Sequence, residues 1–463
     1  MLRTHTCADL TPEDVNKEVT LCGWVKCRRD HGKLIFVDLR DRYGFIQVVF
    51  NPRISSQAYE LAQSIRNEFV LKVKGIVQLR PKGTENLKIP TGKIELEAKE
   101  LEILNSAQNL PFDIEGNGDI SEELRFKYRY LDLRRSQILD NFIFRHKVCN
   151  IIRWFLDKEG FLEFSTPYLT KSTPEGARDF LIPSRLNPGL FYALPQSPQL
   201  FKQILMVGGV DRYYQIATCF RDEDLRQDRQ LEFTQLDLEM SFVEEEDIFN
   251  LCERLMYQIF KQTKALEISL PFRRLTYEDA MGKYGTDKPD LRKEDGSDFS
   301  FVWVINFPLF KYNEEEKRWE SEHHPFTAPK QEDIVNLDTS PQVVRARSYD
   351  LVLNGTEIAS GSIRIHQRAL QEKIFKIIGI SNIESQKRFG FLLEAFQFGA
   401  PPHGGIAFGL DRLISILLGK ESIREVILFP KTQKGICLLT EAPSEVENRQ
   451  LKELKIKLDK NGR

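Results

Sequence analysis

The stretch GGIAFGLDRLISILLG, residues 404–419, carries the pattern that decides the fold. Its first half is small and apolar, as in a buried strand, and its second half has the apolar spacing of a helix. We therefore expect the chain to pass from strand into helix near Gly409, where the missing side chain lets a ligand approach the backbone. Arg412 follows in the first turn of that helix, where it can reach an anion.

Two other charged stretches precede this one. Phe220-Arg221-Asp222-Glu223 follows an apolar run, and Glu357 lies within NGTEIASGS, residues 354–362. The three stretches together supply two arginines and an acid. Arginine forks suit phosphate groups, and carboxylates suit hard metal ions. This combination favours an enzyme that works on a nucleotide by positioning and charge neutralisation.

Composition sets broad limits. The 463 residues suggest two to four domains, and 41% hydrophobic residues are ample for large cores. A net charge of −2 does not by itself indicate a nucleic-acid-binding protein, but residues 26–42 hold six Lys or Arg against three Asp. That segment suits a phosphate backbone, or simply forms a solvated barrel face. Seven cysteines without a C-x-x-C pair predict a reducing, cytoplasmic setting, and no apolar run predicts a membrane span or a secretory signal.

The expected architecture is α+β with an all-β N-terminal domain. Residues 1–105 read as five short strands and one helix-like stretch, which suits an OB-fold barrel that binds nucleic acid, or a barrel without a ligand. Residues 106–130 read as a hinge. Residues 131–440 read as an antiparallel sheet flanked by helices, with a short polar loop at 286–300, and residues 441–463 form a charged extension.

Several strings, in this order, resemble the class II aminoacyl-tRNA synthetases, and among them the bacterial-type aspartyl-tRNA synthetases. They are KYRYLDLRR (127–135), TPEGARDF (173–180), LPQSPQLFKQ (194–203) and HHPFTAP (323–329). Residues 220–223 resemble motif 2, and Gly405 to Arg412 resemble motif 3. A helix at 141–159 followed by a strand and Pro167 resembles motif 1, which implies a homodimer.

The resemblance implies a two-step reaction, in which ATP activates L-aspartate as aspartyl-adenylate and the aspartyl group then passes to the 3′ end of tRNA. Catalytic roles fall on Arg221, Glu357 and Arg412. The residues matching aspartate-binding positions are Glu175, Ser197, Gln199, Lys202, Arg221, Asp237, His323 and Arg364. Those matching ATP-binding positions are Arg221, Asp222, Glu223, Gln230, Phe233, Glu357, Gly409, Leu410, Asp411 and Arg412. Asp350 and Glu357 match Mg²⁺ ligands, and Phe36, Gln47 and Glu95 match anticodon-reading positions.

Two departures from the usual pattern affect what the enzyme does. Bacterial members usually carry an extra domain between motifs 2 and 3, and here residues 286–300 pass straight through that region. His31 and Gly83 resemble the non-discriminating branch, which charges both tRNA(Asp) and tRNA(Asn). This resemblance implies a functional link to an amidotransferase that converts Asp-tRNA(Asn).

Four alternatives remain open on the sequence. The first is a strictly discriminating aspartyl-tRNA synthetase. The second is an asparaginyl-tRNA synthetase, against which Lys202 argues, since an amide substrate does not require that cation. The third is an inactive RNA-binding paralogue, against which Arg221, Glu357 and Arg412 argue. The fourth is a tRNA-independent ligase, but such proteins generally lack a barrel like that of residues 1–105.

Overall fold

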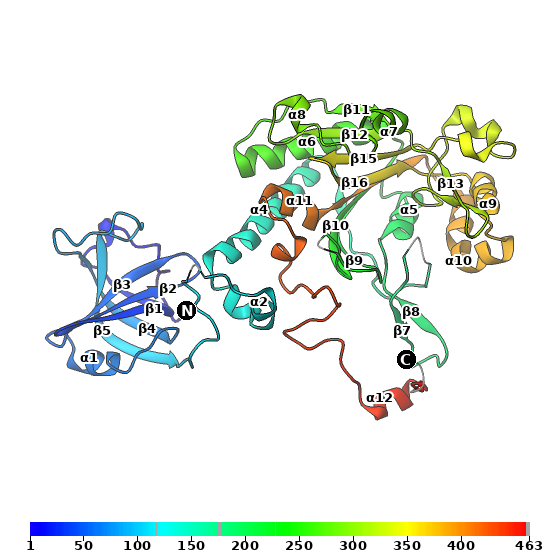
Figure 1. Ribbon diagram of the computed structural model, residues 1–463. Helices are drawn as coiled ribbons and strands as arrows, with labels where there is room; N and C mark the ends of the chain where they lie inside the picture. The colour runs from blue at the N-terminus through cyan, green and yellow to red at the C-terminus, as the bar shows by residue number, and fades with distance from the viewer. Residues whose placement is uncertain (117, 174–176, 227, 460–463) are drawn as a thin grey trace. The chain divides into compact units, whose positions relative to one another are not determined.

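The computed structural model describes residues 1–116, 118–173, 177–226 and 228–459 (Figure 1). The chain forms two compact units. The first comprises Met1–Glu122 and Tyr130–Arg135, and the second comprises Glu123–Arg129 and Ser136–Arg463.

The first unit is a closed five-stranded barrel with strand order β1-β2-β3-β5-β4. Its elements are β1 (Glu18–His31), β2 (Leu34–Arg40), β3 (Phe45–Phe50), α1 (Ser56–Ala62), β4 (Val70–Leu79) and β5 (Ile94–Asn105), after a short 3-10 turn at Pro12–Asp14. Alternate residues such as Ile35, Val37 and Leu39 fill the interior, as the two-residue period of a strand requires. The predicted OB-type barrel is confirmed.

The second unit is built on an eight-stranded sheet with order β11-β12-β15-β16-β17-β10-β9-β6. Its strands are β6 (Leu162–Glu163), β9 (Arg212–Phe220), β10 (Glu232–Ser241), β11 (Arg273–Thr276), β12 (Phe301–Ile305), β15 (Ser348–Leu353), β16 (Thr356–Ile363) and β17 (His403–Gly409). All neighbours are antiparallel except the two edge pairs, β11 with β12 and β6 with β9. The predicted antiparallel sheet is confirmed, with a parallel strand added at each edge.

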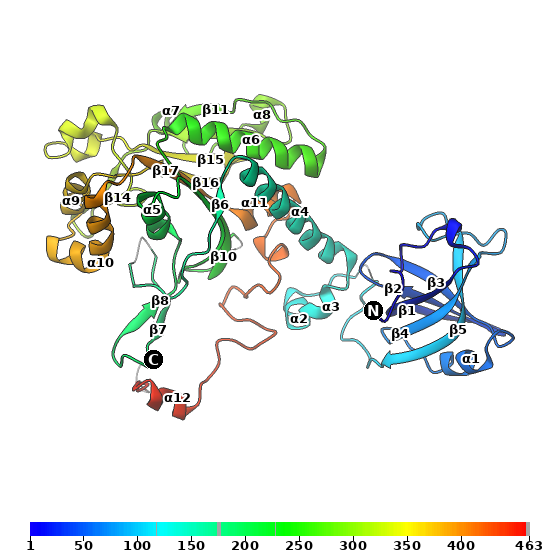
Figure 2. The same ribbon diagram turned by 180° about the vertical axis from the view of Figure 1, so that it is seen from behind.

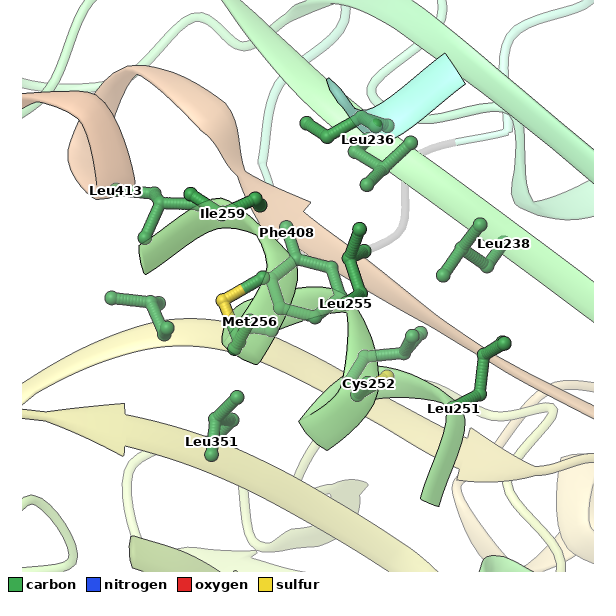
Figure 3. Packing of buried hydrophobic residues seen from close by; sticks show 14 of the residues in the cluster. Leu236, Leu238, Leu251, Cys252, Leu255, Met256, Ile259, Leu351, Phe408 and Leu413 are labelled. Carbon is green, nitrogen blue, oxygen red and sulfur yellow. The ribbon is translucent and has the colours of Figure 1, made fainter. Parts of the chain in front are cut away.

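Three helices, α4 (Ser136–Lys158), α6 (Glu245–Lys264) and α11 (Leu410–Leu417), pack on one face of this sheet. Figure 2 shows α4 and α6 lying across the strands. Figure 3 shows the contact layer: Leu255 and Met256 of α6 pack between Leu351 of β15 and Phe408 of β17. This interface accounts for the largest apolar core of the chain, so it fixes the sheet as a rigid platform.

The opposite face of the sheet is polar along β10. On β10, Leu236, Leu238 and Met240 belong to the apolar core, so Gln235, Asp237 and Glu239 point to the other side. On β17 the residues paired with these are small: Gly409 lies opposite Gln235, Ala407 opposite Asp237, and Gly405 opposite Glu239. Polar side chains on one strand beside an almost bare neighbouring strand leave room for a ligand.

One further helix, α3 (Arg129–Asp132), lies mostly in the segment Tyr130–Arg135 of the first unit. Several further elements complete the second unit. They are α2 (Glu122–Lys127), β7 (Leu181–Pro183), β8 (Phe191–Ala193), α5 (Gln199–Val207), α7 (Tyr277–Tyr284), α8 (Arg292–Asp295), β13 (Phe310–Asn313), β14 (Arg318–Ser321), α9 (Arg368–Ile377), α10 (Asn382–Ala395), α12 (Asn448–Glu453) and short 3-10 turns at Gln331–Asn336, Pro341–Val343, Phe396–Phe398 and Ile423–Glu425. The polar segment 286–300 contains only α8 before β12 begins. Within the described ranges, no helix is long and apolar enough to cross a membrane.

Candidate active site

A cavity of about 800 Å³ lies on the polar face of the sheet of the second unit. Fourteen of the residues singled out from the sequence line it: Ser197, Gln199, Lys202, Arg221, Glu223, Gln230, Phe233, Asp237, His323, Glu357, Arg364, Gly409, Asp411 and Arg412. They come from positions more than two hundred residues apart, and the antiparallel pairing of β16, β17 and β10 brings many of them together.

One end of the cavity is a buried cluster of four charges. Lys202, on α5, places its Nζ 3.1 Å from Asp237 Oδ1 and 3.3 Å from Glu239 Oε2. Arg364, just after β16, places its Nε 2.9 Å from Glu239 Oε1. All four side chains are at most 2% exposed. Two cations and two carboxylates balance each other, which buried charges require. We call these four side chains the buried charge cluster.

Glu239 is the centre of this cluster, and sequence reasoning missed it. A Cβ on Gly405 would lie 2.0 Å from Glu239 Oε2, so the glycine provides the space for this carboxylate. Burial alone would raise the pKa of Glu239, but Arg364 and Lys202 outweigh it and lower that pKa. For Asp237 burial prevails over Lys202, and the pKa is raised. The signal in the sequence was the alternation Asp237-Leu238-Glu239, which places both carboxylates on one face of a strand.

Arg364 is held by further contacts that fix its orientation. Its Nη1 donates to Ser362 Oγ at 2.7 Å and lies 2.6 Å from His324 Nε2. A guanidinium only donates, so His324 Nε2 accepts from Arg364, while the Phe326 N–H lies 3.2 Å from His324 Nδ1 and Thr327 Oγ1 lies 3.5 Å from it. Burial, followed by the Arg364 charge, lowers the pKa of His324 well below its usual value, which keeps the ring neutral. The guanidinium is therefore positioned before any ligand arrives.

Three polar atoms in this end of the cavity have no hydrogen-bond partner among the described residues. They are Gln199 Nε2, Asp237 Oδ2 and His323 Nδ1. All three side chains line the cavity, and unpaired buried polar atoms are costly, so they are expected to be satisfied by a polar ligand. Asp237 Oδ2 can accept from an ammonium group, and Gln199 Nε2 can donate to a carboxylate.

The other end of the cavity is more open and holds exposed charges. The Arg221 guanidinium lies 5.1 Å from the Phe233 ring centre, which leaves an aromatic surface and a cation side by side. Glu223 pairs with Arg229 at 2.9 Å. The Arg412 Nη1 donates to the Glu357 carbonyl at 2.6 Å. An aromatic ring beside an arginine suits a purine base with phosphates.

Gln230 and Asp411 are held by protein partners. Gln230 makes two hydrogen bonds to Lys431, donating to its carbonyl at 3.0 Å and accepting from its N–H at 2.8 Å. Asp411 accepts from the Thr234 N–H at 2.8 Å and pairs with Arg145. These contacts indicate that Asp411 anchors the start of α11.

Two positions matched to ATP contacts do not line the cavity. Leu410 is fully buried in the apolar core on the other face of the sheet. Asp222 makes a backbone bridge and a 3.7 Å ion pair with Arg178. Glu175, matched to aspartate binding, lies outside the described residues.

Asp350 and Glu357 extend from β15 and β16 on the same face of the sheet, because Asp350 pairs with Ser360 and Glu357 with Val352. Asp350 Oδ1 is buried and makes no hydrogen bond among the described residues, although His323 Nε2 lies 3.4 Å away. Glu357 Oε2 pairs with Lys288 Nζ at 2.8 Å. Burial alone would lower the pKa of His323, but Asp350 raises it. Two carboxylates on one face fit a hard divalent cation.

Protein ligands alone would not complete such a metal site. In the part of the chain that the structure describes, no group of three or more His, Cys, Asp or Glu is arranged to hold a metal ion. Mg²⁺ usually takes one or two carboxylates and completes its shell with phosphate oxygens and water. The donor set therefore fits a metal that arrives with a nucleotide.

The residues matched to anticodon reading lie together on the barrel. Gln47 Nε2 donates to Glu95 Oε2 at 2.7 Å, and Arg29 bridges Gln47 and Asp38. Burial raises the pKa of Glu95. The half-buried side chains of this group point outward from the barrel wall, where they can meet bases.

Of the two positions matched to tRNA specificity, one joins this group. The His31 ring meets Phe36 edge-on, with the ring centres 5.5 Å apart. Gly83 lies in an exposed loop and has φ +89°, a conformation that L side chains rarely adopt.

The first unit is thus a barrel of a kind that binds nucleic acid, and the second unit holds a cavity that suits a small zwitterion and a nucleotide. The sequence matches the class II tRNA synthetases (D, K and N) over residues 121–433 and the OB-fold nucleic acid binding domain over residues 19–104. The chain belongs to the class II tRNA synthetases of this group.

Curated relatives are similar along the whole chain. The chain is 48% identical to "Aspartate--tRNA(Asp/Asn) ligase" of Dictyoglomus turgidum, over 99% of this chain and 98% of that protein. It is 46% identical to the protein of the same name from Thermodesulfovibrio yellowstonii, over 99% of this chain and 100% of that protein. The first alignment spans 582 positions, whereas this chain has 463 residues. More than a hundred positions of this alignment therefore have no residue in this chain.

Solved structures share the fold. An asparaginyl-tRNA synthetase from Pyrococcus horikoshii complexed with asparaginyl-adenylate has a TM-score of 0.76 at 23% identity, covering 93% of this chain and 99% of that one. An aspartyl-tRNA synthetase from Entamoeba histolytica has a TM-score of 0.73 at 24% identity, and the match covers 92% of this chain and 91% of that one.

Proposed function

We propose that this enzyme is an aspartate–tRNA ligase that charges both tRNA(Asp) and tRNA(Asn). The observation that carries the proposal is the buried charge cluster with three unpaired polar atoms beside it. Arg364 and Lys202 offer donors to a side-chain carboxylate, and Asp237 Oδ2 offers an acceptor to an ammonium group. This arrangement matches L-aspartate, which carries both groups.

In the first step a carboxylate oxygen of aspartate bonds to the α-phosphorus of ATP, and the bond from that phosphorus to the β-phosphate oxygen breaks. Arg221 neutralises charge on the α-phosphate, and Arg412 meets the γ-phosphate. No protein base is required, because the attacking carboxylate is already ionised. Positioning and charge neutralisation therefore account for the catalysis.

Asp350 and Glu357 would hold Mg²⁺, which would neutralise phosphate charge when bound. We assign closure over the substrate to His323, which lies beside Asp350. Glu223 and Gln230 would orient the adenine, and Phe233 would stack on it. Asp222 and Leu410 contribute through the backbone in this proposal, and Glu175 would bind the ammonium group.

The barrel would read the anticodon. Phe36 offers a ring for stacking, and Gln47 and Glu95 offer hydrogen bonds to base edges. We assign tolerance of the third anticodon base to His31 and Gly83. An enzyme that charges tRNA(Asn) with aspartate needs an amidotransferase to complete Asn-tRNA(Asn), so we propose that functional link.

We also propose a homodimer in the cytoplasm. Exposed apolar side chains gather on α4 and the segment after it: Ile143, Trp154, Leu162, Phe164, Tyr168 and Leu169. A patch of this kind commonly marks an interface. All seven cysteines are free, which suits a reducing compartment. Analytical sedimentation tests the proposed homodimer, and cell fractionation tests the proposed cytoplasmic location.

The first experiment measures aspartylation of tRNA(Asp) and tRNA(Asn) transcripts side by side, with labelled aspartate. Comparable charging of both supports the proposal. A large preference for tRNA(Asp) that disappears on changing His31 and Gly83 makes the enzyme discriminating. Activation of asparagine in preference to aspartate, or no aspartate-dependent ATP–pyrophosphate exchange, contradicts the ligase proposal itself.

The anticodon assignment has its own test. Phe36→Ala removes the stacking ring, which is worth about 1–3 kcal/mol per base. We expect the KM for tRNA to rise by roughly tenfold or more, with aspartate-dependent exchange unchanged. A change in exchange would place the effect on the fold of the chain instead.

A further inference from the structure

Lys288 is a cation at the nucleotide end of the cavity whose role the resemblance did not assign. It lies in the loop between α7 and α8, and it lines the cavity. Leu291, three residues later, is 1% exposed and belongs to a small apolar core with residues of β12 and β15. The loop is therefore anchored to the sheet just beyond Lys288.

A second attachment holds the loop against the β15–β16 hairpin. Gly355, in the turn of this hairpin, has φ +77°, and a Cβ there would lie 3.1 Å from Asp290 Cβ and 3.7 Å from the Lys288 carbonyl oxygen. The loop backbone thus packs directly on the turn that leads to Glu357. Lys288 is placed beside Glu357 by packing and not only by charge.

Two cations flank Glu357. Lys288 Nζ lies 2.8 Å from its carboxylate, and Arg412 donates to its carbonyl. The Lys288 side chain is 40% exposed and that of Glu357 28%. Such a partly exposed pair is weak, so a ligand with stronger charge can exchange it.

The position of Lys288 along the cavity decides which part of a substrate it meets. Glu357 and Arg364 are seven residues apart on and just after β16, so roughly 20 Å separates them along an extended strand. Lys288 is beside Glu357, far from the buried charge cluster at Arg364. Lys288 therefore lies at the same end of the cavity as Arg412.

We propose that Lys288 binds the β- and γ-phosphate oxygens of ATP and stabilises the departing pyrophosphate. The assignment rests on the proposed function. When the bond between the α-phosphorus and the bridging oxygen breaks, that oxygen leaves with the electron pair and pyrophosphate gains negative charge. The Lys288 ammonium neutralises this charge, having left Glu357 when the nucleotide binds.

The test compares nucleotides that differ only in the phosphates that Lys288 would touch. Lys288→Met keeps the chain length and removes the charge, and Lys293→Met removes an exposed lysine of α8 that does not line the cavity. Binding of ATP and of AMP is measured by calorimetry on the full chain, with and without Mg²⁺. We expect K288M to weaken ATP binding roughly tenfold and to leave AMP binding unchanged, as loss of one charge-assisted contact predicts. Lys288→Arg retains most of the affinity for ATP, and K293M changes neither.

Kinetics supply a second readout. In aspartate-dependent ATP–pyrophosphate exchange, K288M raises the KM for ATP and for pyrophosphate and leaves the KM for aspartate within about twofold. Unchanged ATP binding, or equal weakening of ATP and AMP, overturns the assignment. If the wild-type chain shows no aspartate-dependent exchange, the proposed function fails, and the comparison of ATP with AMP still decides whether Lys288 contacts the phosphates.

Discussion

The two ends of the cavity hold their charges in different ways. At the aspartate end, the four side chains of the buried charge cluster are each at most 2% exposed and pair with one another. At the nucleotide end the paired side chains stay partly in water: Glu223 is 28% exposed, Arg229 47%, Arg412 29% and Asp228 57%. The same residue types thus form a fixed set at one end and an exchangeable set at the other.

The difference follows from the cost of burying charge. Removing one partner of a buried pair leaves an uncompensated charge and costs about 3–5 kcal/mol, whereas an exposed pair is worth roughly 0.2–1 kcal/mol. A small carboxylate substrate gains specificity from donors that are fixed before it binds. A triphosphate brings its own charge, so it can displace weak pairs without a large penalty.

The strongest test of this contrast is Glu239→Gln. The change keeps the volume and removes the charge shared by Lys202 and Arg364. We expect the free energy of unfolding to fall by about 3–5 kcal/mol and aspartate-dependent exchange to fall roughly 100-fold or more. Chemical denaturation and exchange kinetics measure the two effects.

A control on the same strand separates burial from charge. Glu232 of β10 pairs with Lys431 at 2.7 Å but is 48% exposed. Glu232→Gln should change stability by less than about 1 kcal/mol. Similar losses in E232Q and E239Q would show that burial does not set the difference between the two ends.

The next largest effect is expected for Arg364→Lys, which keeps the positive charge and removes the planar set of guanidinium donors. Arg364 contacts Glu239 through two nitrogens and also donates to Ser362 Oγ and to His324 Nε2. A lysine cannot reproduce these directions. We expect the KM for aspartate to rise by roughly 30- to 100-fold, equivalent to about 2–3 kcal/mol, with ATP binding within twofold. If charge alone suffices, R364K will activate aspartate normally.

Much of the fold could be predicted because its periodicities are local. The barrel strands alternate, and residues 404–419 pass from strand to helix at Gly409, as β17 and α11 do. Helices α5 and α10 were not predicted. In α5 the buried face includes Lys202 and Gln203 as well as apolar residues, and α10 has Gly390 in its interior, so neither shows a clean apolar stripe.

The site was predictable where a residue's role follows from its type, and not where it follows from its neighbours. Lys202 and Arg364 could be matched to a carboxylate substrate. That Glu239 would hold both depends on how α5 packs across β10 and on the space above Gly405, which no local pattern encodes. The pairing of Lys288 with Glu357 likewise depends on packing between a loop and a hairpin.

An ion-pair group outside the cavity allows an effect on stability to be measured without an effect on ligand binding. Glu245, at the start of α6, pairs with Arg347 and with Lys330, and neither partner lines the cavity. Although burial alone would raise its pKa, hydrogen bonds from Arg347 and its other partners lower the pKa of Glu245 from 4.5 to about 2. Its folded-state pKa is depressed, so its stabilisation is complete above the unfolded pKa and is lost as pH falls through the folded one.

We therefore expect Glu245→Gln to lower the free energy of unfolding by about 2 kcal/mol at pH 7. The difference in the free energy of unfolding between the variant and the wild type should decrease below about pH 4.5, and it should be less than half of its value at pH 7 by about pH 3. Urea denaturation across this range measures it, and aspartate and ATP binding at pH 7 should not change. A gap that is constant with pH would assign the effect to packing and not to the charge.

The smallest effect is expected at the nucleotide end. Arg229→Ala removes the partner of Glu223, and both side chains already contact water. We expect the free energy of unfolding to change by less than about 0.5 kcal/mol, because solvent replaces the lost pair. The KM for ATP should stay within about threefold, measured by pyrophosphate exchange beside Glu239→Gln. A loss above about 1.5 kcal/mol would mean that this end is also fixed before the ligand binds, and the exchange of partners proposed for ATP would then lose its physical basis.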